Sequence, residues 1–384
     1  MIPKIDQIQI RNYKSIGRAV VPLEPFTALV GPNGAGKSNF VDALSFVQDC
    51  LAESIEMAFR KRGSLSAVRR RSGGHPVDIG LRLGLTLSEG VTAEYSFEIA
   101  AELGERFRVA REHCVVRRPS AEPASFSIED GVFSKEIPGI RPRVSPDRLA
   151  LFAASATEEF RPVYDFLTAM RFYSVVPGRL RELQDPDAGE FLKPDGSNAA
   201  AVLKRLRDDP LGTERYERIC RLLSKVVEGV ESVEYQNVGQ KETLVFQQDI
   251  GLDYPLTFDA MNMSDGTLRI LGLLLAVYQP HPSSVVAIEE PESTIHPAAA
   301  ELVMQVLLDA SRTQQVLITT HSPDILDHKS LHDSQIRVVT QRRGDTSIAM
   351  VSPAGRQAIR ERLYTPGELL RSDELLPDLE EARF

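Results

Sequence analysis

The chain has 384 residues, of which 42% are hydrophobic and 26% are charged, and its formal net charge is −9. This length allows two to three domains, and the composition excludes a disordered or fibrous chain. The negative charge argues against a nucleic-acid-binding surface that covers the whole molecule. It leaves room for a local basic site, because charges more than about 8 Å apart are screened at physiological salt.

Cysteine usage and hydropathy indicate where the protein works. Cys50, Cys114 and Cys220 lie far apart and include no CxxC pair, which argues against a disulfide framework or a zinc ribbon and favours a reducing cytoplasm. The N-terminal stretch lacks the apolar core of a signal peptide. The most apolar stretch, LRILGLLLAVY, is too short to cross a membrane and contains Arg269. We therefore expect a cytoplasmic protein with no membrane contact.

The first predicted elements form an α/β unit. Ile8 and Ile10 have strand spacing, and residues 26–30, FTALV, read as an apolar strand followed by a glycine-rich loop. Residues 37–61 then predict one long amphipathic helix. The apolar residues that share one face of this helix are Phe40, Ala43, Leu44, Val47 and Leu51.

The middle of the chain has a different pattern. Residues 77–133 alternate strand and turn signals, which predicts an antiparallel meander. Residues 143–172 and 199–230 look helical, with a break at Pro210 and Gly212, and residues 231–258 return to strands.

The last third again alternates helices with short β-branched runs, which implies a mostly parallel sheet. We expect one head domain built from both ends of the chain, with two inserted units between them. The expected division is residues 1–60 and 260–384 for the head, 61–142 for an antiparallel β subdomain with a basic segment, and 143–259 for a helical insert with a returning β hairpin.

The stretch GPNGAGKS, Gly31–Ser38, fits the phosphate-loop pattern G-x4-G-K-[ST] between an apolar strand and a helix. Its glycines allow backbone N–H groups to surround a phosphate at a helix N-terminus. Lys37 would then reach the β- and γ-phosphates and Ser38 would bind Mg²⁺. The alternative, a glycine-rich turn with a stray lysine, does not explain the flanking strand and helix.

The stretch SVVAIEEPESTIHP brings an apolar run directly into two carboxylates. Three interpretations compete: a metal site, a general base, or a solvated strand end. Because ligands gather at the carboxyl ends of strands in an open α/β sheet, we expect Glu289 to be the acid on the metal side, in direct or water-mediated contact. Glu290 would act as the general base that orients the attacking water.

Two further stretches carry candidate site residues. In LITTHSPDIL, His321 follows an apolar strand and could sense the γ-phosphate, although a histidine before Ser-Pro is also common in a capped turn. In MNMSDGTLRIL, Ser264 is a good N-cap, and Gly266 permits close approach to the start of an apolar helix.

With GPNGAGKSN, MSDGT, IEEPE and TTHSP in that order, the chain resembles the ABC-class ATPases of the RecF, SMC and OLD group, and more closely the stand-alone predicted ATPases of the AAA_21 type. The N-terminal IQIRNYKSIGRAVVPLEPFTALV and the closing YTPGELLRSDEL are also similar to that group. The resemblance implies a P-loop NTPase of the ABC-ATPase head type. Such a head has a mostly parallel core sheet, an antiparallel β subdomain and an inserted helical subdomain.

The resemblance also implies roles for individual residues. Glu290 would be catalytic, His321 the switch histidine, and Ser264 and Gly266 would bind the γ-phosphate of a second subunit. Phosphate and Mg²⁺ would be bound by Asn33, Gly34, Ala35, Gly36, Lys37, Ser38 and Asn39, and the base or ribose would be bordered by Arg11, Asn12 and Lys14.

Two departures from the group stand out. None of Gln184, Gln247 and Gln248 can be assigned as the glutamine of the Q-loop. No TOPRIM-like acidic nuclease domain follows the head, so we do not expect self-contained nuclease activity.

The segment FRKRGSLSAVRRR is the candidate nucleic-acid site, with Arg69, Arg70 and Arg71 as its expected contacts. Arg60, Lys61 and Arg62 belong to the same basic cluster. A solvated helix end and loop is the alternative, because no aromatic residues interleave with the charges.

The sequence thus predicts a slow ATPase that uses ATP and Mg²⁺, forms a homodimer on ATP, and acts on DNA or on an effector protein. Genome maintenance and anti-phage defence are the expected settings. The alternative is a nucleotide-gated scaffold that holds a toxin or nuclease with little turnover. A transporter ATPase is disfavoured because MSDGT is not the usual transporter signature, and a small-molecule kinase would not need this loop.

Overall fold

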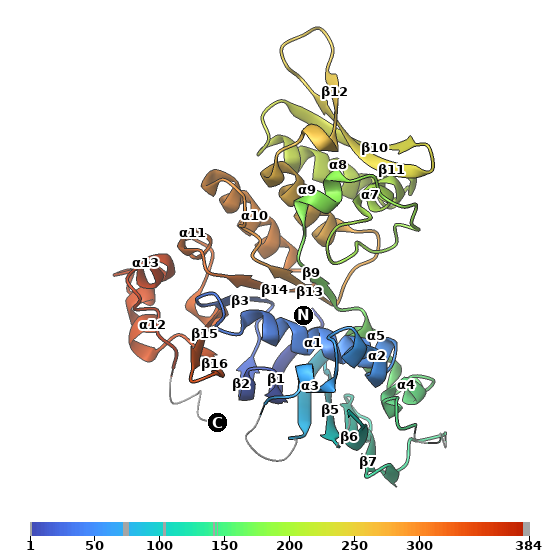
Figure 1. Cartoon of the computed structure of the whole chain (residues 1–384). Coiled ribbons are helices and arrows are strands. Elements are labelled where there is room, and N and C mark those ends of the chain that lie inside the picture. The colour runs from blue at the N-terminus through green and yellow to red at the C-terminus, as the bar shows by residue number, and fades with distance from the viewer. Residues whose placement is uncertain (1, 72–76, 103–104, 141–142, 144, 379–384) are drawn as a thin grey trace.

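Three β-sheets organise the molecule (Figure 1). The computed structural model describes residues 2–71, 77–102, 105–140, 143 and 145–378. Parts of the predicted β subdomain (72–76, 103–104 and 141–142) and the end of the predicted head (379–384) therefore lie outside the described residues. The fold class predicted from the sequence, an ABC-type head with a mostly parallel core sheet, is confirmed.

The central sheet has six strands in the order β16-β15-β3-β14-β13-β9. Within this sheet, neighbouring strands pair in parallel, except that β16 is antiparallel to β15. The N-terminal strand β3 thus lies between two strands from the C-terminal third. The strands are β3 (Phe26–Val30), β9 (Arg171–Tyr173), β13 (Val285–Glu289), β14 (Gln315–Thr320), β15 (Ile336–Arg342) and β16 (Asp345–Met350).

The second sheet has seven antiparallel strands in the order β2-β1-β4-β5-β6-β7-β8. Strands β4 to β8 follow one another along the chain, which is the meander expected for residues 77–133. Strands β1 and β2, which the sequence division groups with the head, pair with this meander. The strands are β1 (Lys4–Tyr13), β2 (Ile16–Pro22), β4 (Ile79–Ser88), β5 (Val91–Ala101), β6 (Phe107–Arg117), β7 (Ala124–Glu129) and β8 (Val132–Lys135).

The third sheet, β10-β11-β12, packs with helices to form the upper lobe in Figure 1. The expected break in the helical insert separates α7 from α8. The elements of this lobe are α6 (Pro177–Arg181), α7 (Ala199–Asp208), α8 (Thr213–Ser224), β10 (Val230–Val238), β11 (Lys241–Gln248), β12 (Leu256–Asp259), η1 (Ala260–Asn262) and α9 (Asp265–Tyr278).

The remaining helices flank the sheets and the C-terminal end. No helix among the described residues is both long and apolar enough to span a membrane. These helices are α1 (Lys37–Ala52), α2 (Ile55–Arg60), α3 (Leu65–Val68), α4 (Ala150–Ala154), α5 (Arg161–Thr168), α10 (Pro297–Ala310), α11 (Pro323–Leu326), η2 (Asp333–Gln335), α12 (Pro353–Arg360) and α13 (Pro366–Arg371).

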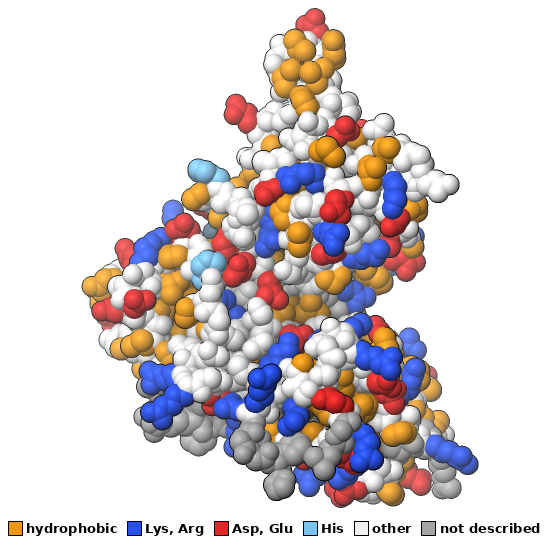
Figure 2. All heavy atoms as spheres, in the orientation of Figure 1, with side chains coloured by type: hydrophobic (Ala, Val, Ile, Leu, Met, Phe, Trp, Pro, Cys, Tyr) orange, Lys and Arg blue, Asp and Glu red, His pale blue; other side chains and the backbone are white. Residues whose placement is uncertain are grey.

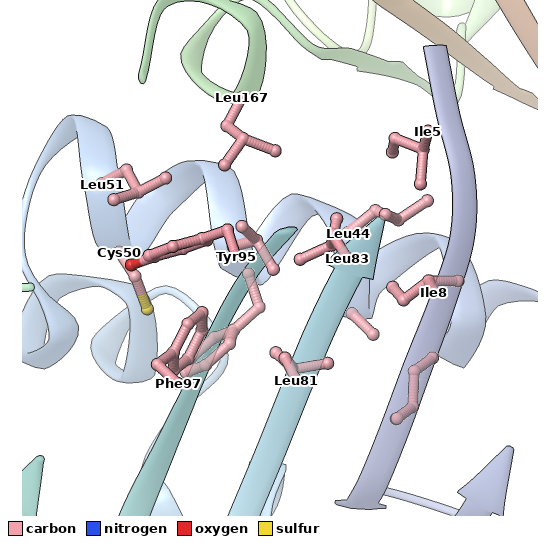
Figure 3. Close-up of a cluster of buried hydrophobic side chains, with 14 of the residues drawn as sticks. Ile5, Ile8, Leu44, Cys50, Leu51, Leu81, Leu83, Tyr95, Phe97 and Leu167 are labelled. Carbon is pink, nitrogen blue, oxygen red and sulfur yellow. The ribbon is translucent and has the colours of Figure 1, made fainter. Parts of the chain in front are cut away.

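Helix α1 lies in one hydrophobic core with the antiparallel sheet. In Figure 3, Leu44 and Leu51 of α1 face Ile8, Leu83 and Tyr95 of that sheet. The central sheet separates this core from a second one on its opposite face, because successive strand residues point to opposite sides. Along β13 the alternate residues Val285 and Ala287 join the first core, and Val286 and Ile288 join the core that contains α9 and α10.

Two predicted helical spans are wrong. The span 37–61 is interrupted after Ala52, because Ser54 adopts an extended conformation and its side chain accepts a hydrogen bond from the Met57 N–H at 3.2 Å, which starts α2. The span 143–172 contains two short helices and then β9, which pairs in parallel with β13. Pairing with an existing sheet edge outweighs the local helical pattern there.

Candidate nucleotide site

The phosphate loop connects β3 to α1 and depends on two glycines. Gly36 has φ of 107°, and a Cβ there would lie 2.2 Å from Thr346 Oγ1. A Cβ on Gly31 would lie 2.1 Å from the carbonyl oxygen of Val339. Both distances are too short for a real contact, so strands β15 and β16 can pack against the loop only where it has no side chain.

Thr346 and Ser15 hold the loop from outside, and sequence reasoning missed both. The Thr346 hydroxyl donates to the Ala35 carbonyl at 3.0 Å and lies 2.7 Å from Ser15 Oγ. Asn39 Nδ2 donates to Ser15 Oγ at 2.6 Å. Nothing in the local sequence around Thr346 signals this role, since the contact joins positions 311 residues apart.

Lys37 begins α1 and points back into the loop. Its ammonium donates to the carbonyls of Gly31 at 2.7 Å and Pro32 at 3.1 Å, and the residue is 6% exposed. Burial lowers the pKa of Lys37, and the nearby carboxylates of Glu290, Glu292 and Glu289 oppose that shift. A cation held only by neutral carbonyls, next to acidic groups, is well placed to bind phosphate.

Ser38 and Glu289 meet as the sequence predicts for a metal site. The Ser38 hydroxyl donates to Glu289 Oε2 at 2.5 Å, which joins the start of α1 to the end of β13. These oxygen ligands are of the type that Mg²⁺ prefers, and the ion usually takes its remaining ligands from phosphates and water. In the described part of the chain, no group of three or more His, Cys, Asp or Glu side chains could hold a metal ion.

Glu290 stands one residue beyond β13 in an unusual backbone conformation. Its φ is 44°, which is rare for a residue other than glycine, and its N–H donates to the carbonyl of Thr319 at 3.0 Å. Its Oε1 lies 3.2 Å from His321 Nδ1. Strained backbone at such a position often marks a functional site, and here it turns the carboxylate toward the histidine that follows β14.

Arg269 and Glu292 complete the site and were not predicted as site residues. Arg269, on α9, is 7% exposed and donates to the carbonyls of Glu289 at 2.9 Å and Glu290 at 2.7 Å. Glu292 accepts a hydrogen bond from Thr320, and burial raises the pKa of its carboxyl group. The signal for Arg269 was a lone charge in an apolar helix, which usually means that the charge has an internal partner.

Ser264 and Gly266 lie at the start of α9. Ser264 is exposed, and its hydroxyl caps the helix by accepting from the Thr267 N–H at 3.1 Å. A Cβ on Gly266 would come within 3.0 Å of the Thr294 carbonyl oxygen. Among the described residues, no hydrogen bond joins Ser264 or Gly266 to the phosphate loop of the same chain. The helix start therefore points to solvent, while Arg269 ties the same helix to the acidic strand end.

The three N-terminal candidates for base or ribose contacts go to different places. Lys14 binds Asp42 of α1 at 2.5 Å and precedes Ser15, so it lies beside the phosphate loop. Asn12 donates to the carbonyl of Asp78 at 2.9 Å. Arg11 binds Glu98 at 2.9 Å on the outer face of the antiparallel sheet, so it is not brought to the phosphate loop.

The basic cluster divides into two parts. Arg60, Lys61 and Arg62 each bind carboxylates of the head. Arg70 binds Asp345 and donates to the Ser15 carbonyl at 3.4 Å. Arg69, Arg70 and Arg71 line a cavity of about 510 Å³ together with Lys14 and Arg343.

The glutamines considered for the Q-loop lie away from the phosphate loop. Gln184 is buried in the upper lobe, where its side chain accepts from the Ala200 N–H at 2.9 Å. Gln247 and Gln248 belong to β11. The strand β9 is followed by Ser174 and Val175, so no glutamine occupies the carboxyl end of that strand.

The fold and this arrangement of loop, acids and histidine are those of a P-loop NTPase of the ABC-ATPase head type. Residues 26–327 match the model of the AAA_21 family, described as "AAA domain, putative AbiEii toxin, Type IV TA system". The chain therefore belongs to this family, as its sequence motifs indicated.

Similarity to individual proteins agrees with this assignment. The Old nuclease of Escherichia phage P2 is 24% identical over 358 residues, covering 86% of this chain and 58% of that protein. Structural maintenance of chromosomes protein 1 of Arabidopsis thaliana is 32% identical over 108 residues, covering 28% of this chain and 9% of that protein. The chain thus spans little more than half of the first relative and a small part of the second.

The solved structures most relevant here are Smc head domains. A Smc head bound to the C-terminal winged-helix domain of ScpA superposes with a TM-score of 0.53 at 15% identity, covering 91% of this chain and 99% of that chain. A Pyrococcus furiosus Smc head with an extended coiled coil, bound to the C-terminal domain of ScpA, gives the same TM-score and identity and covers 94% of this chain and 100% of that chain. This similarity shows the fold.

Proposed function

We propose that the protein binds ATP with Mg²⁺ and hydrolyses it slowly to ADP and phosphate, in a site completed by a second copy of the chain. The observation that carries this proposal is the meeting of Ser38 with Glu289 beside the Glu290–His321 pair, at the carboxyl ends of parallel strands. Membership of the AAA_21 family supports ATPase activity independently.

In this proposal each side chain has one task. Lys37 exchanges the carbonyls of its own loop for phosphate oxygens, and the N–H groups of Asn33 to Asn39 surround the phosphates. Ser38 and Glu289 would hold Mg²⁺, which neutralises charge between the β- and γ-phosphates.

The chemical step uses the carboxylate at the end of β13. Glu290 takes a proton from a water molecule as the water attacks the γ-phosphorus and the bond to the ADP oxygen breaks. His321 Nδ1 lies 3.2 Å from Glu290 Oε1 and orients this carboxylate. The same histidine would contact the γ-phosphate.

The second subunit would contribute Ser264 and Gly266. The exposed N-terminus of α9 offers the positive end of a helix dipole to an anion. Arg269 connects this helix to the Glu289 and Glu290 carbonyls. Closure of α9 on the nucleotide of the partner subunit would therefore act on the two acids in the same chain as that helix.

For the downstream role we propose action on DNA or on an effector protein, in genome maintenance or anti-phage defence in the cytoplasm. The family description names a toxin of a type IV toxin–antitoxin system, and one relative is a phage nuclease. The buried, unpaired thiols Cys50, Cys114 and Cys220 suit a reducing compartment. A second candidate, a gated scaffold that restrains a toxin or nuclease, would show nucleotide binding with little turnover.

Two isosteric changes test the chemistry. Glu290→Gln should keep ATP binding, lower hydrolysis about 100-fold or more, and accumulate an ATP-bound dimer, because the water loses its base. Glu289→Gln should instead raise the Mg²⁺ concentration required. Nucleotide titrations and phosphate release measure both; interchanged phenotypes would show that the two acids have the opposite roles.

The composite site has its own test. Wild-type hydrolysis per subunit should rise with protein concentration, and Ser264→Arg should block hydrolysis without blocking ATP binding. Mixing Ser264→Arg with Lys37→Ala should restore part of the activity, since one site regains an intact loop and an intact α9 start. Activity independent of concentration, in a protein that stays monomeric with ATP by light scattering, would contradict the dimer.

The DNA arm depends on the cluster that contains Arg69, Arg70 and Arg71. Changing all three to Glu should weaken DNA binding and reduce its dependence on salt. If the wild type and the triple variant bound DNA equally in an anisotropy titration, these residues would not be the DNA contacts. The effector protein would then remain as the proposed partner.

A further inference from the structure

Strand β9 ends the central sheet, and a cleft lies beside its outer edge. Its side away from β13 has no neighbouring strand among the described residues. The cleft has a volume of about 600 Å³ and is lined by Met170 to Tyr173, the loop 191–194, and polar residues of α1. Figure 2 shows the surface hollowed between the upper lobe and the body that carries α1 and α2.

The backbone of β9 offers hydrogen-bonding groups to this cleft. Just past the strand, the N–H groups of Ser174 and Val176 donate to the carbonyls of Pro194 at 2.9 Å and Asp195 at 3.0 Å. Alternate residues of a strand direct their N–H groups to the same side, so the N–H of Phe172 points the same way, and among the described residues it makes no hydrogen bond outside the sheet. An open sheet edge of this kind is a template for another strand.

Four cationic side chains line the cleft, Lys61, Arg62, Arg171 and Lys193, and three of them already bind carboxylates. Arg62 binds Asp42 and Asp49 at 2.8 Å each, Lys61 binds Asp49 at 2.7 Å, and Lys193 binds Asp187 at 3.1 Å. The positive charge that remains for an acidic ligand is therefore that of Arg171.

Arg171 is the cation that lacks an acidic partner. Its guanidinium stacks over Phe191 at 4.1 Å and donates to the carbonyls of Thr168 and Met170. Within the described part of the chain, no carboxylate lies at salt-bridge distance from it. It is also half-buried, so that a carboxylate reaching it would be partly shielded from water and strongly attracted.

We propose that this cleft binds an extended segment of a partner protein, which pairs with β9 and places a carboxylate side chain on Arg171. Strand addition supplies backbone hydrogen bonds, and the pocket for one side chain supplies specificity. The rings of Phe172 and Phe191 offer apolar contact to the residues that flank the acid.

A peptide fits these observations better than a nucleic acid. Because Arg171 is the one lining cation without a carboxylate partner among the described residues, the cleft suits a single acidic group on a peptide with neutral backbone on either side better than a continuous phosphate backbone. The elements that line the cleft are also connected to the nucleotide site. Helix α1 begins at Lys37, and β9 pairs with β13, whose last residue is Glu289.

The binding test uses defined probes: a labelled, end-blocked peptide of alternating valine and glutamate, seven residues long, and the same peptide with lysine for glutamate. Fluorescence anisotropy should show the glutamate peptide binding at least about tenfold more tightly to the wild type. Arg171→Met keeps a long side chain over Phe191 but removes the charge, so it should abolish the preference for the glutamate peptide. Arg171→Glu should reverse that preference. The matched control, Arg312→Met, changes an arginine that is 79% exposed and should have no effect.

Strand pairing has a separate readout. Two versions of the glutamate peptide, N-methylated at alternate residues, each lack the N–H donors of one edge, and only one version should lose affinity. Equal affinities of the two, or no preference for glutamate in the wild type, would overturn the proposal. So would a labelled oligonucleotide that competes with the peptide and loses binding in Arg171→Met. If Arg171→Glu fails to fold by circular dichroism, Arg171→Met decides the result.

Discussion

Two buried cations lie against α1, Arg62 along its middle and Lys37 at its first residue, and their partners differ. Arg62 has a side chain that is 7% exposed, and its guanidinium binds Asp42 and Asp49 at 2.8 Å, the Ala58 carbonyl at 2.9 Å and Ser45 at 3.1 Å. Burial raises the pKa of Asp42, but Arg62, Lys14 and Tyr13 outweigh it and hold this pKa below its ordinary value. Each charge in this cluster has a partner of opposite sign.

The nucleotide end of the helix is left incomplete. Among the described residues, Lys37 has only backbone carbonyls as hydrogen-bond partners, and Glu292 Oε2 and Arg269 Nε are buried without a hydrogen bond. Native proteins rarely leave such groups unsatisfied without a reason. The satisfied cluster therefore stabilises the fold, and we propose that the unsatisfied one is arranged for a ligand.

The largest effect on stability should come from Arg62→Met. Removing this guanidinium leaves the buried carboxylate of Asp49 and the half-buried carboxylate of Asp42 without their shared partner, which should lower the free energy of unfolding by about 3 kcal/mol. Urea unfolding measures the loss.

Lys37→Met, at the first residue of α1, is the variant matched to Arg62→Met. It should change the free energy of unfolding by no more than about 1 kcal/mol and weaken ATP binding about 100-fold or more, since it removes the cation that faces phosphate. If Lys37→Met destabilised the protein as much as Arg62→Met, the contrast between the two cations would be wrong.

Glu112 extends the comparison to a buried anion. Its carboxylate accepts from the N–H groups of Ala150 at 2.6 Å and Leu151 at 2.9 Å and from Tyr95 OH at 3.0 Å. Burial outweighs these bonds and raises its pKa to about 7, from an ordinary value of 4.5. Between these pH values the folded state keeps a proton that the unfolded chain releases.

The free energy of unfolding should therefore fall as pH rises from about 4.5 to 7, by up to about 3 kcal/mol from this group at about 1.4 kcal/mol per pKa unit. Glu112→Gln should lack this part of the slope. Parallel denaturation curves of both proteins at several pH values isolate the difference. Identical slopes would mean that Glu112 is ionised throughout.

The smallest effect belongs to the helix caps. Ser264→Ala and Ser54→Ala each remove a hydroxyl that accepts from a backbone N–H, at 3.1 Å and 3.2 Å. Both should cost about 1 kcal/mol of stability. Only Ser264→Ala should also lower ATP hydrolysis, because its helix start would face a partner's nucleotide. Unchanged hydrolysis in Ser264→Ala would confine Ser264 to capping.

How much of the fold and of the nucleotide site could be predicted depends on how local each sequence signal is. The phosphate loop and the strand ending at Glu289 follow from short motifs whose spacing reflects one loop and one strand end. Lys37, Ser38 and Glu290 therefore lie where the sequence placed them, while their chemical roles stay predictions. The boundaries of the three sequence units also stay a prediction.

The residues that sequence reasoning missed are joined through space. Thr346 reaches the phosphate loop from β16 and Ser15 reaches it from the β1–β2 turn, while β9 forms a strand by pairing with β13. Arg11 went to Glu98 because its side chain points to the solvent face of β1. Such outcomes depend on tertiary pairing, which local patterns do not record.

The hydrogen bond from Thr346 to the Ala35 carbonyl also affects when nucleotide binding can arise during synthesis of the chain. β3 must pair with β14 and β15, and the loop closes only when β16 arrives. A nascent chain that ends before β15 carries the complete phosphate-loop motif but lacks its supporting walls. Nucleotide affinity should therefore appear late, and two halves split between residues 239 and 240, in the β10–β11 turn, should gain it only on reassembly, which would make ATP binding a direct reporter of complementation between fragments.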